Sequence, residues 1–206
     1  SKWSMANLAA IMVHAAPGTE ILIDADAHVV NLTAAGITAI AGVQPRFIQP
    51  SGRTFNATDV NRAARAPSRY SPRASLLCVE NTHNGAGGAI TSIEALRELA
   101  QTARDLSIPL HLDGARLWNV ETATGVSVAE YAACAATVMV SFSKGLGAPV
   151  GAALAGPADF IGGGMDDGRD TLDGGSGIDV LFGKAVFDTF FGPEVGDDVR
   201  LIDDLN

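Results

Sequence analysis

Short apolar runs alternate with longer amphipathic stretches along residues 1–161. The apolar runs predict strands at residues 20–24, 43–49, 76–80, 109–113, 137–141 and 152–155. Helical spacing of apolar residues predicts helices over 4–14, 31–40 and 92–106, and residues 53–70 are expected to be a surface helix and loop. Ser4 and Ser92 are the expected N-caps of two of these helices. This alternation is typical of an α/β fold with a mostly parallel sheet flanked by helices.

A change in composition near Gly162 divides the chain into two segments, which we expect to be separate domains, 1–161 and 162–206. Residues 1–161 carry 11 basic and 12 acidic side chains, whereas residues 162–206 carry 3 and 11 and hold 10 of the 23 glycines. The whole chain is 47% hydrophobic with a net charge of −9. These values exclude a disordered chain and give no support for nucleic-acid binding.

Membrane and disulfide signals are weak. No apolar run reaches the length that a membrane-spanning helix needs. The first residues lack the basic and apolar regions of a signal peptide, so we expect none. Cys78 and Cys134 are too few for a disulfide framework.

Polar side chains follow several of the predicted strands. In a parallel α/β sheet, ligands bind beyond the carboxyl ends of the strands. Each such residue alone is more often an ordinary loop residue, but their joint placement predicts a ligand site. The candidates are Asp26, His28, Glu80, His83, Asn84, Asp113, Arg116, Ser141, Ser143 and Lys144.

Three stretches carry a more specific signal: HLDGARL at 111–117, SFSKGLGAPVG at 141–151, and ENTHN at 80–84 followed by Gly87 and Gly88. Together with Met5-Ala6-Asn7 and Asp26-Ala27-His28, they resemble the signature motifs of the threonine aldolases. These are pyridoxal-phosphate (PLP) enzymes of the aspartate-aminotransferase-like fold. The resemblance runs from about Ser4 to Ile161 and implies a PLP fold type I large domain, truncated at both ends.

The resemblance also implies site residues. It makes Lys144 the Schiff-base lysine, Asp113 the partner of the pyridinium nitrogen and His28 the ring that stacks on the cofactor. Arg116 would lie near the cofactor and the substrate carboxylate, and His83 would be a candidate base near the substrate hydroxyl. Ser4 would contact the cofactor phosphate. PLP chemistry needs a lysine and a carboxylate in these two positions. Where the family carries Ser-Gly-Thr, this sequence has Lys2-Trp3-Ser4.

The implied activity is a lyase reaction of amino-acid metabolism, the retro-aldol cleavage of L-threonine or L-allo-threonine to glycine and acetaldehyde. The resemblance further implies a cytoplasmic homo-oligomer, a dimer or tetramer, that acts on a small amino-acid substrate and needs neither nucleic acid nor membrane. Two alternatives stay open for this segment: another PLP lyase of the same fold, such as a β-eliminating one, or a PLP-type domain without catalysis.

The second segment shows a period of nine residues. Glycines 168 and 177, aspartates 170, 179 and 188, and the apolar residues 172, 181 and 190 each recur at this spacing. The copy at 174–182, GGSGIDVLF, matches the calcium-binding RTX nonapeptide. The resemblance implies a short all-β, β-roll-like tail that binds Ca²⁺ through Asp170, Asp179 and Asp188, and export by type I secretion. The alternatives are a flexible Gly/Asp-rich tail or, for the whole chain, a secreted calcium-binding module with a non-catalytic PLP-fold relic.

Overall fold

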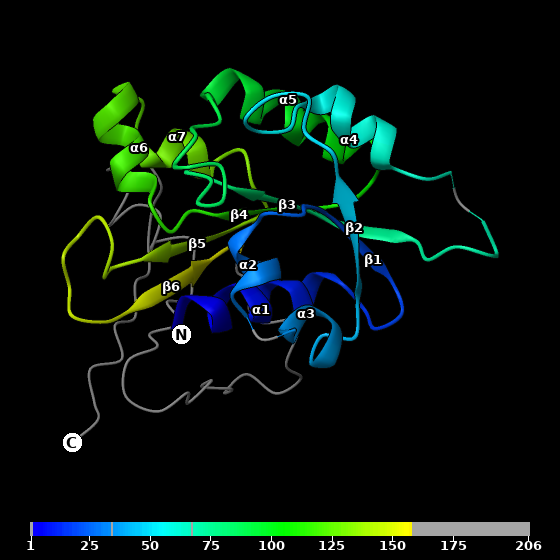
Figure 1. Cartoon of the computed structure of the whole chain (residues 1–206). Helices are drawn as coiled ribbons and strands as arrows, with labels where there is room; N and C mark the ends of the chain where they lie inside the picture. The colour runs from blue at the N-terminus through cyan, green and yellow to red at the C-terminus, as the bar shows by residue number, and fades with distance from the viewer. Residues whose placement is uncertain (1, 34, 67, 158–206) are drawn as a thin grey trace.

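A computed structural model describes residues 2–33, 35–66 and 68–157, and it contains a sheet with helices on both faces (Figure 1). The strands are β1 (Glu20–Asp24), β2 (Gln44–Ile48), β3 (Ala74–Glu80), β4 (Leu110–Asp113), β5 (Thr137–Ser141) and β6 (Ala152–Ala155). They lie in the order β2-β1-β3-β4-β5-β6. Neighbours pair in parallel except β6, which is antiparallel to β5. The expected mostly parallel sheet is therefore confirmed.

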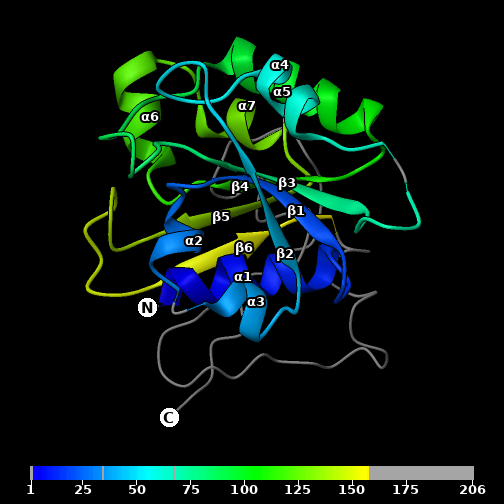
Figure 2. The ribbon, with the colours of Figure 1, turned by 45° about the vertical axis from the view of Figure 1, so that its right-hand side comes forward.

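The helices form a layer on each side of the sheet. They are α1 (Lys2–His14), α2 (His28–Asn31), α3 (Gly36–Ala39), α4 (Ala57–Ala63), α5 (Ile93–Asp105), α6 (Leu117–Thr124) and α7 (Val128–Ala132). Figure 1 shows α4, α5, α6 and α7 above the sheet and α1, α2 and α3 below it, and Figure 2 shows the same two layers from another side.

Two of the local predictions are wrong. Ser4 is not an N-cap, because α1 already begins at Lys2 and Ser4 lies within the helix. The single helix expected over 31–40 is replaced by the short helices α2 and α3, and Ala35 between them has the left-handed φ of 62°. An L-residue in that conformation cannot continue a right-handed helix. The cap at Ser92 is confirmed, since its hydroxyl accepts a hydrogen bond from the Ala95 amide.

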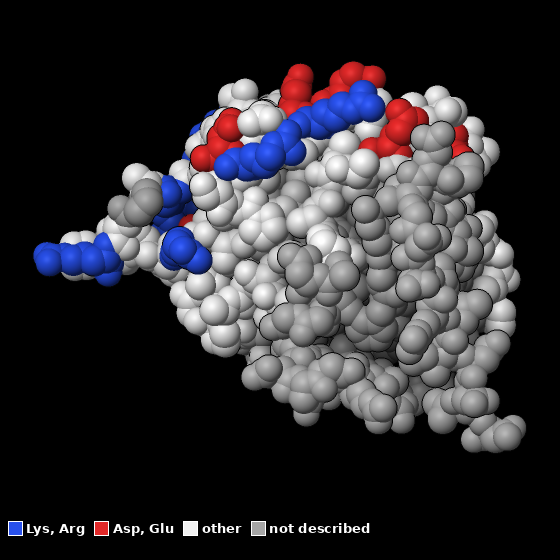
Figure 3. Space-filling view, turned by 180° about the vertical axis from the view of Figure 1, so that it is seen from behind, with Lys and Arg blue, Asp and Glu red and all other residues white. Residues whose placement is uncertain are grey.

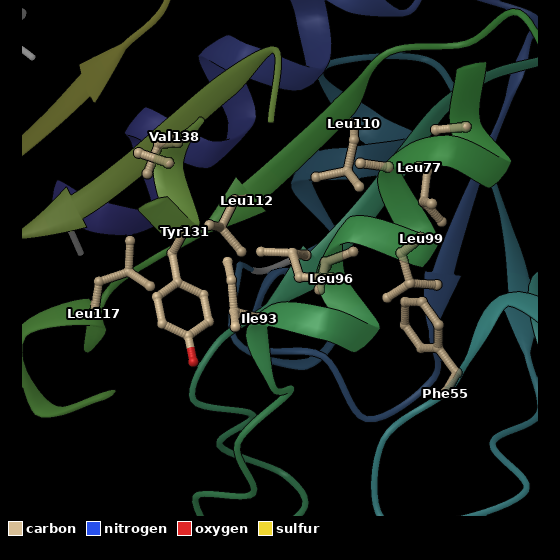
Figure 4. Packing of buried hydrophobic residues seen from close by; sticks show 14 of the residues in the cluster. Phe55, Leu77, Ile93, Leu96, Leu99, Leu110, Leu112, Leu117, Tyr131 and Val138 are labelled. Atoms are coloured by element: carbon tan, nitrogen blue, oxygen red, sulfur yellow. The ribbon is translucent and has the colours of Figure 1, made fainter. Parts of the chain in front are cut away.

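The larger core lies between the sheet and the upper helices. Figure 4 shows Leu112 of β4 beside Ile93 and Leu96 of α5, with Leu77 of β3 nearer Leu99 of the same helix. On the opposite face of the sheet, a second cluster joins α1 to β1 and β3. Because both faces are covered, β1, β4 and β5 are buried along their whole length. The sheet is thus a rigid platform whose carboxyl edge can hold functional side chains.

Helix α1 lies on the lower face of the sheet and runs from the carboxyl ends of the strands toward their amino ends. Its residue Asn7 contacts Asp113 at the carboxyl end of β4, whereas His14 contacts Thr137 at the start of β5. α1 therefore runs opposite to the parallel strands, and its first turn reaches the carboxyl edge of the sheet.

The outer surface of the upper layer is charged. Figure 3, seen from behind, shows acidic and basic side chains side by side along the upper edge of the molecule. α5 contributes such a mixed face through the exposed residues Glu94, Arg97, Glu98, Arg104 and Asp105. Among the described residues, no helix is long and apolar enough to cross a membrane. Both Cys78 and Cys134 are free thiols, as expected.

Candidate active site

Three neighbouring strands end in a buried carboxylate. Asp24 closes β1, Glu80 closes β3 and Asp113 closes β4, and their relative exposures are only 5%, 8% and 7%. Glu80 and Asp113 are register partners in the parallel pair of β3 and β4. Burial of like charges is costly, so each carboxylate needs hydrogen-bond donors or a neighbouring cation.

Glu80 holds two loops together. One carboxylate oxygen accepts the backbone amide of His28 at 2.8 Å, and the other accepts the amide of Asn84 at 3.0 Å. The loop after β1 and the loop after β3 are thereby fixed to one side chain. Gly85 makes this close approach feasible, because a Cβ atom there would collide with the backbone oxygen of Asp26.

Asp24 pairs with His83. Its Oδ2 lies 3.5 Å from His83 Nε2, while its Oδ1 accepts the amide of Asp26 at 2.8 Å. The contact with Asp24 raises the pKa of His83 against the effect of burial. Burial disfavours the ionised form of Asp24, but the contacts with His83 and the Asp26 amide outweigh it and lower the pKa of that carboxyl. The Ala86 amide donates to His83 Nδ1 at 3.1 Å, so the neutral ring carries its proton on Nε2, toward Asp24.

Asp113 has the most strongly perturbed carboxyl of the three. Burial, reinforced by the charge of Glu80, raises its pKa to about 7, although the Ala115 amide and the Asn7 side chain both donate to it. Those two bonds measure 3.2 and 2.6 Å. A carboxylate has about four lone-pair sites, so Asp113 can still accept a further donor. A cation beside it would remove the electrostatic penalty.

Lys144, Arg116 and His28 face this carboxylate edge. Lys144 lies three residues beyond β5, and Arg116 is the N-cap residue of α6. Burial, followed by the charge of Arg116, lowers the pKa of Lys144, while Asp113 and Glu80 oppose the change. Burial also lowers the pKa of His28, and Lys144 and Arg116 act in the same direction. These interactions relate Lys144, Arg116 and His28 to one another and to Glu80, and they relate Lys144 to Asp113.

The turn from β4 to Arg116 depends on Gly114. A Cβ atom there would lie 2.5 Å from Leu117 Cδ1 and 2.9 Å from the Met139 carbonyl oxygen. The Gly114 amide donates to that carbonyl at 2.8 Å. Any larger residue would therefore push α6, and Arg116 with it, away from β5 and Lys144.

These residues fit a pyridoxal phosphate group. His28 Nδ1 is buried and has no hydrogen-bond partner within the described part of the chain. An acidic group for a pyridinium N–H, an amine of lowered pKa and a buried imidazole nitrogen without a partner are the groups that this cofactor requires. Ser4 is buried in the first turn of α1, at the same edge.

The structure brings most of the predicted site residues to one region. Lys144 interacts with Asp113, Arg116 and His28, while His83 lies beside Asp24. Asp170, Asp179 and Asp188 lie outside the described residues. Within residues 2–33, 35–66 and 68–157, no group of three or more His, Cys, Asp or Glu side chains is arranged to hold a metal ion.

Sequence reasoning missed the support of Asp113. Asn7 of α1 donates to the carboxylate and also contacts His111, which lies two residues before Asp113 on the same face of β4. The alternation of side chains along a strand could have indicated His111. Nothing in the spacing could have paired either residue with Asn7, more than 100 positions away in the chain.

Comparisons with known proteins show which family and fold this chain resembles. The profile of the family described as "Beta-eliminating lyase" matches residues 3–166. An uncharacterised protein of Caenorhabditis elegans is 39% identical over 160 residues, which are 77% of this chain and 38% of that protein. Low-specificity L-threonine aldolase 1 of Arabidopsis thaliana is 36% identical over 162 residues, 77% of this chain and 45% of the enzyme.

A solved structure of the Leishmania major threonine aldolase superposes with a TM-score of 0.63 at 20% identity, covering 70% of this chain and 42% of that one. At this identity the likeness concerns the fold alone. The chain spans less than half the length of the curated relatives it matches.

Replacing Asp113 by Asn should change how stability depends on pH. Because the folded pKa of about 7 exceeds the ordinary value of 3.8, the wild-type carboxyl stabilises the fold while protonated. That contribution is complete below the ordinary value and is lost as the pH rises through 7. Without added cofactor, the free energy of unfolding of Asp113→Asn, relative to that of wild type, should therefore rise by on the order of 3 kcal/mol between pH 5 and pH 8. Urea unfolding at both pH values measures the difference.

The exposed carboxyl of Asp105 on α5 provides the matched control, and Asp105→Asn should follow the wild-type curve at both pH values. If Asp113→Asn also follows it, Asp113 does not carry a raised pKa.

Proposed function

The chain belongs to the beta-eliminating lyase family, and from this premise we propose that residues 1–161 form the large domain of a PLP-dependent lyase of the threonine aldolase type. The observation that carries the proposal is that Lys144, Arg116 and His28 lie together at the strand ends that carry the buried carboxylates of Glu80 and Asp113. Curated relatives that are threonine aldolases support the choice of reaction.

Four residues would hold the cofactor. Asp113 would accept the pyridinium N–H, and the positive charge there would offset the unfavourable burial of two neighbouring carboxylates. Lys144 would bind the aldehyde carbon through its amine, which a lowered pKa helps to keep unprotonated. The imidazole of His28 would cover one ring face. Ser4 in the first turn of α1 would contact the phosphate, where the helix dipole favours an anion.

The remaining site residues would act on the substrate. Arg116 offers a planar guanidinium that suits the carboxylate of an amino acid. His83, whose Nε2–H faces Asp24, would take the proton from the β-hydroxyl on Nδ1 once the Ala86 amide releases that nitrogen, while the Cα–Cβ bond breaks. When bound, PLP supplies the electron sink for the pair released from that bond. The aldehyde then leaves, and the α-carbon takes up a proton to give glycine.

The substrate class follows from these roles. A small α-amino acid with a β-hydroxyl presents both a carboxylate for Arg116 and a hydroxyl proton for His83, as L-threonine and L-allo-threonine do. We further propose that the protein acts as a homo-oligomer, a dimer or tetramer.

Cofactor attachment at Lys144 can be tested directly because the chain contains only three lysines, Lys2, Lys144 and Lys184. The full chain is incubated with pyridoxal phosphate near neutral pH, reduced with borohydride and digested. Mass spectrometry should find the label on Lys144, because its lowered pKa gives it a larger fraction of free amine than an ordinary lysine has.

Lys144→Arg should abolish the label while keeping the positive charge, and Lys184→Arg should leave it unchanged. Equal labelling of all three lysines in the wild type would show nonspecific modification and would contradict a cofactor site at Lys144.

Product analysis separates the two lyase reactions. An aldolase converts L-threonine to glycine and acetaldehyde, whereas a β-eliminating enzyme releases a keto acid and ammonia. We expect the aldol products, and we expect His83→Asn to lower kcat by about 100-fold or more through loss of the base, while the absorption spectrum with PLP stays unchanged. A keto acid product would favour β-elimination, and an unchanged kcat in His83→Asn would remove His83 as the base.

For residues 162–206 we propose calcium binding, on the nine-residue repeat of the sequence alone. The family profile ends at residue 166, so most of this segment lies beyond the lyase family. Carboxylates and turn carbonyls are ligands suited to Ca²⁺. Millimolar CaCl₂ should change the far-ultraviolet circular dichroism, MgCl₂ should not, and Asp179→Asn should weaken the response. A circular dichroism spectrum that CaCl₂ leaves unchanged would exclude calcium binding.

A further inference from the structure

A chain of buried side chains runs from the Asp113 carboxylate through the lower layer to His14. Asn7 Nδ2 donates to Asp113 Oδ2 at 2.6 Å, and Asn7 Oδ1 lies 2.9 Å from His111 Nε2. His111 Nδ1 lies 2.9 Å from Thr137 Oγ1, which lies 2.9 Å from His14 Nε2. The three inner members, Asn7, His111 and Thr137, are almost completely buried.

The direction of every bond in this chain follows from the ionised carboxylate. A carboxylate can only accept, so Asn7 must turn its NH₂ group toward Asp113 and its oxygen toward His111. That oxygen can also only accept, so Nε2 of His111 must carry a proton. His111 is neutral, because burial lowers its pKa to about 3, and its Nδ1 is therefore bare.

The same argument fixes the directions of the hydrogen bonds from His111 through Thr137 to His14. A bare Nδ1 on His111 must accept the hydroxyl proton of Thr137. Thr137 has no second proton, so it must accept from Nε2–H of His14. Burial lowers the pKa of His14 to about 4, so this residue also donates as a neutral imidazole near pH 7. All four bonds thus point toward Asp113, and aligned bonds of this kind strengthen one another.

We propose that Asn7, His111 and Thr137 are positioning residues that favour the ionised form of the Asp113 carboxyl and direct it toward the site through this one-way series of hydrogen bonds. Their purpose rests on the proposed function, since an ionised Asp113 is what a pyridinium nitrogen requires. The chain fixes His111 as the Nε2–H tautomer, although the ring itself touches neither substrate nor cofactor.

Other charged groups also act on Asp113, so the series of hydrogen bonds accounts for only part of the effect on its pKa. Glu80 on β3 opposes ionisation, and Lys144 beyond β5 favours it. On the side of α1, the uncharged Asn7 donates to Asp113, and His14 is the titratable group that acts on His111. Removing the Thr137 hydroxyl breaks the chain without touching Asn7, Glu80 or Lys144.

The test uses the full chain without cofactor. Histidine ¹⁵N spectra report which ring nitrogen of His111 is protonated, and aspartate ¹³C carboxyl spectra report the titration of Asp113. In the wild type we expect a neutral Nε2–H tautomer at pH 8 to 9, where Asp113 is ionised. In Thr137→Val we expect a mixture of tautomers and an Asp113 acid dissociation constant about threefold smaller, the effect of about one modest hydrogen bond.

Two further variants separate this effect from a general loss of packing. Thr137→Ser keeps a hydroxyl and should restore both signals. Thr102→Val removes another buried threonine hydroxyl, which donates to the Glu98 carbonyl on the opposite side of the sheet, and it should change neither signal.

A doubly protonated or Nδ1–H form of His111 near pH 8 would overturn the proposal, as would an Asp113 titration that is the same in Thr137→Val and Thr102→Val. These measurements need no PLP, so a protein that fails to bind PLP would contradict the proposed function while leaving the hydrogen-bond chain intact. If PLP does bind, Thr137→Val should weaken its affinity about threefold relative to Thr137→Ser.

Discussion

The Asp113 carboxylate is buried at the carboxyl end of β4, beside the carboxylate of Glu80 on the neighbouring strand. Two acidic groups in this position are tolerated only if donors and cations surround them. The structure supplies Asn7 from below, the Ala115 amide from the following turn, and Lys144 from the loop after β5. Much of the arrangement at this edge of the sheet follows from that requirement.

The same requirement links the core to the site. α1 packs apolar side chains against the sheet and also carries Asn7 to Asp113 and His14 to Thr137. A change that shifts α1 would therefore disturb the carboxylate as well as the packing. Glu80 has a comparable double role, because it fixes the loops that hold His28 and Asn84.

The sequence predicted the strands well because each is a short, nearly continuous apolar run between turn residues. It also placed Lys144, Asp113, Arg116 and His28 at one edge, since parallel strands share the side on which they end. It failed where local signals are short. α6 buries only Leu117 and Val120, and the break in the helix expected over 31–40 depends on the backbone of Ala35. Contacts such as Asn7 with Asp113 join distant parts of the chain and leave no local pattern.

The central claim is that Asp113 serves to hold a cationic group of a bound cofactor. A ¹³C titration of the Asp113 carboxyl in the full chain, with and without pyridoxal phosphate, tests it most directly. We expect a pKa near 7 without the cofactor and a pKa well below the ordinary aspartate value with it. An unchanged titration in the presence of bound pyridoxal phosphate would contradict the claim, because a pyridinium paired with Asp113 cannot leave its ionisation unaffected.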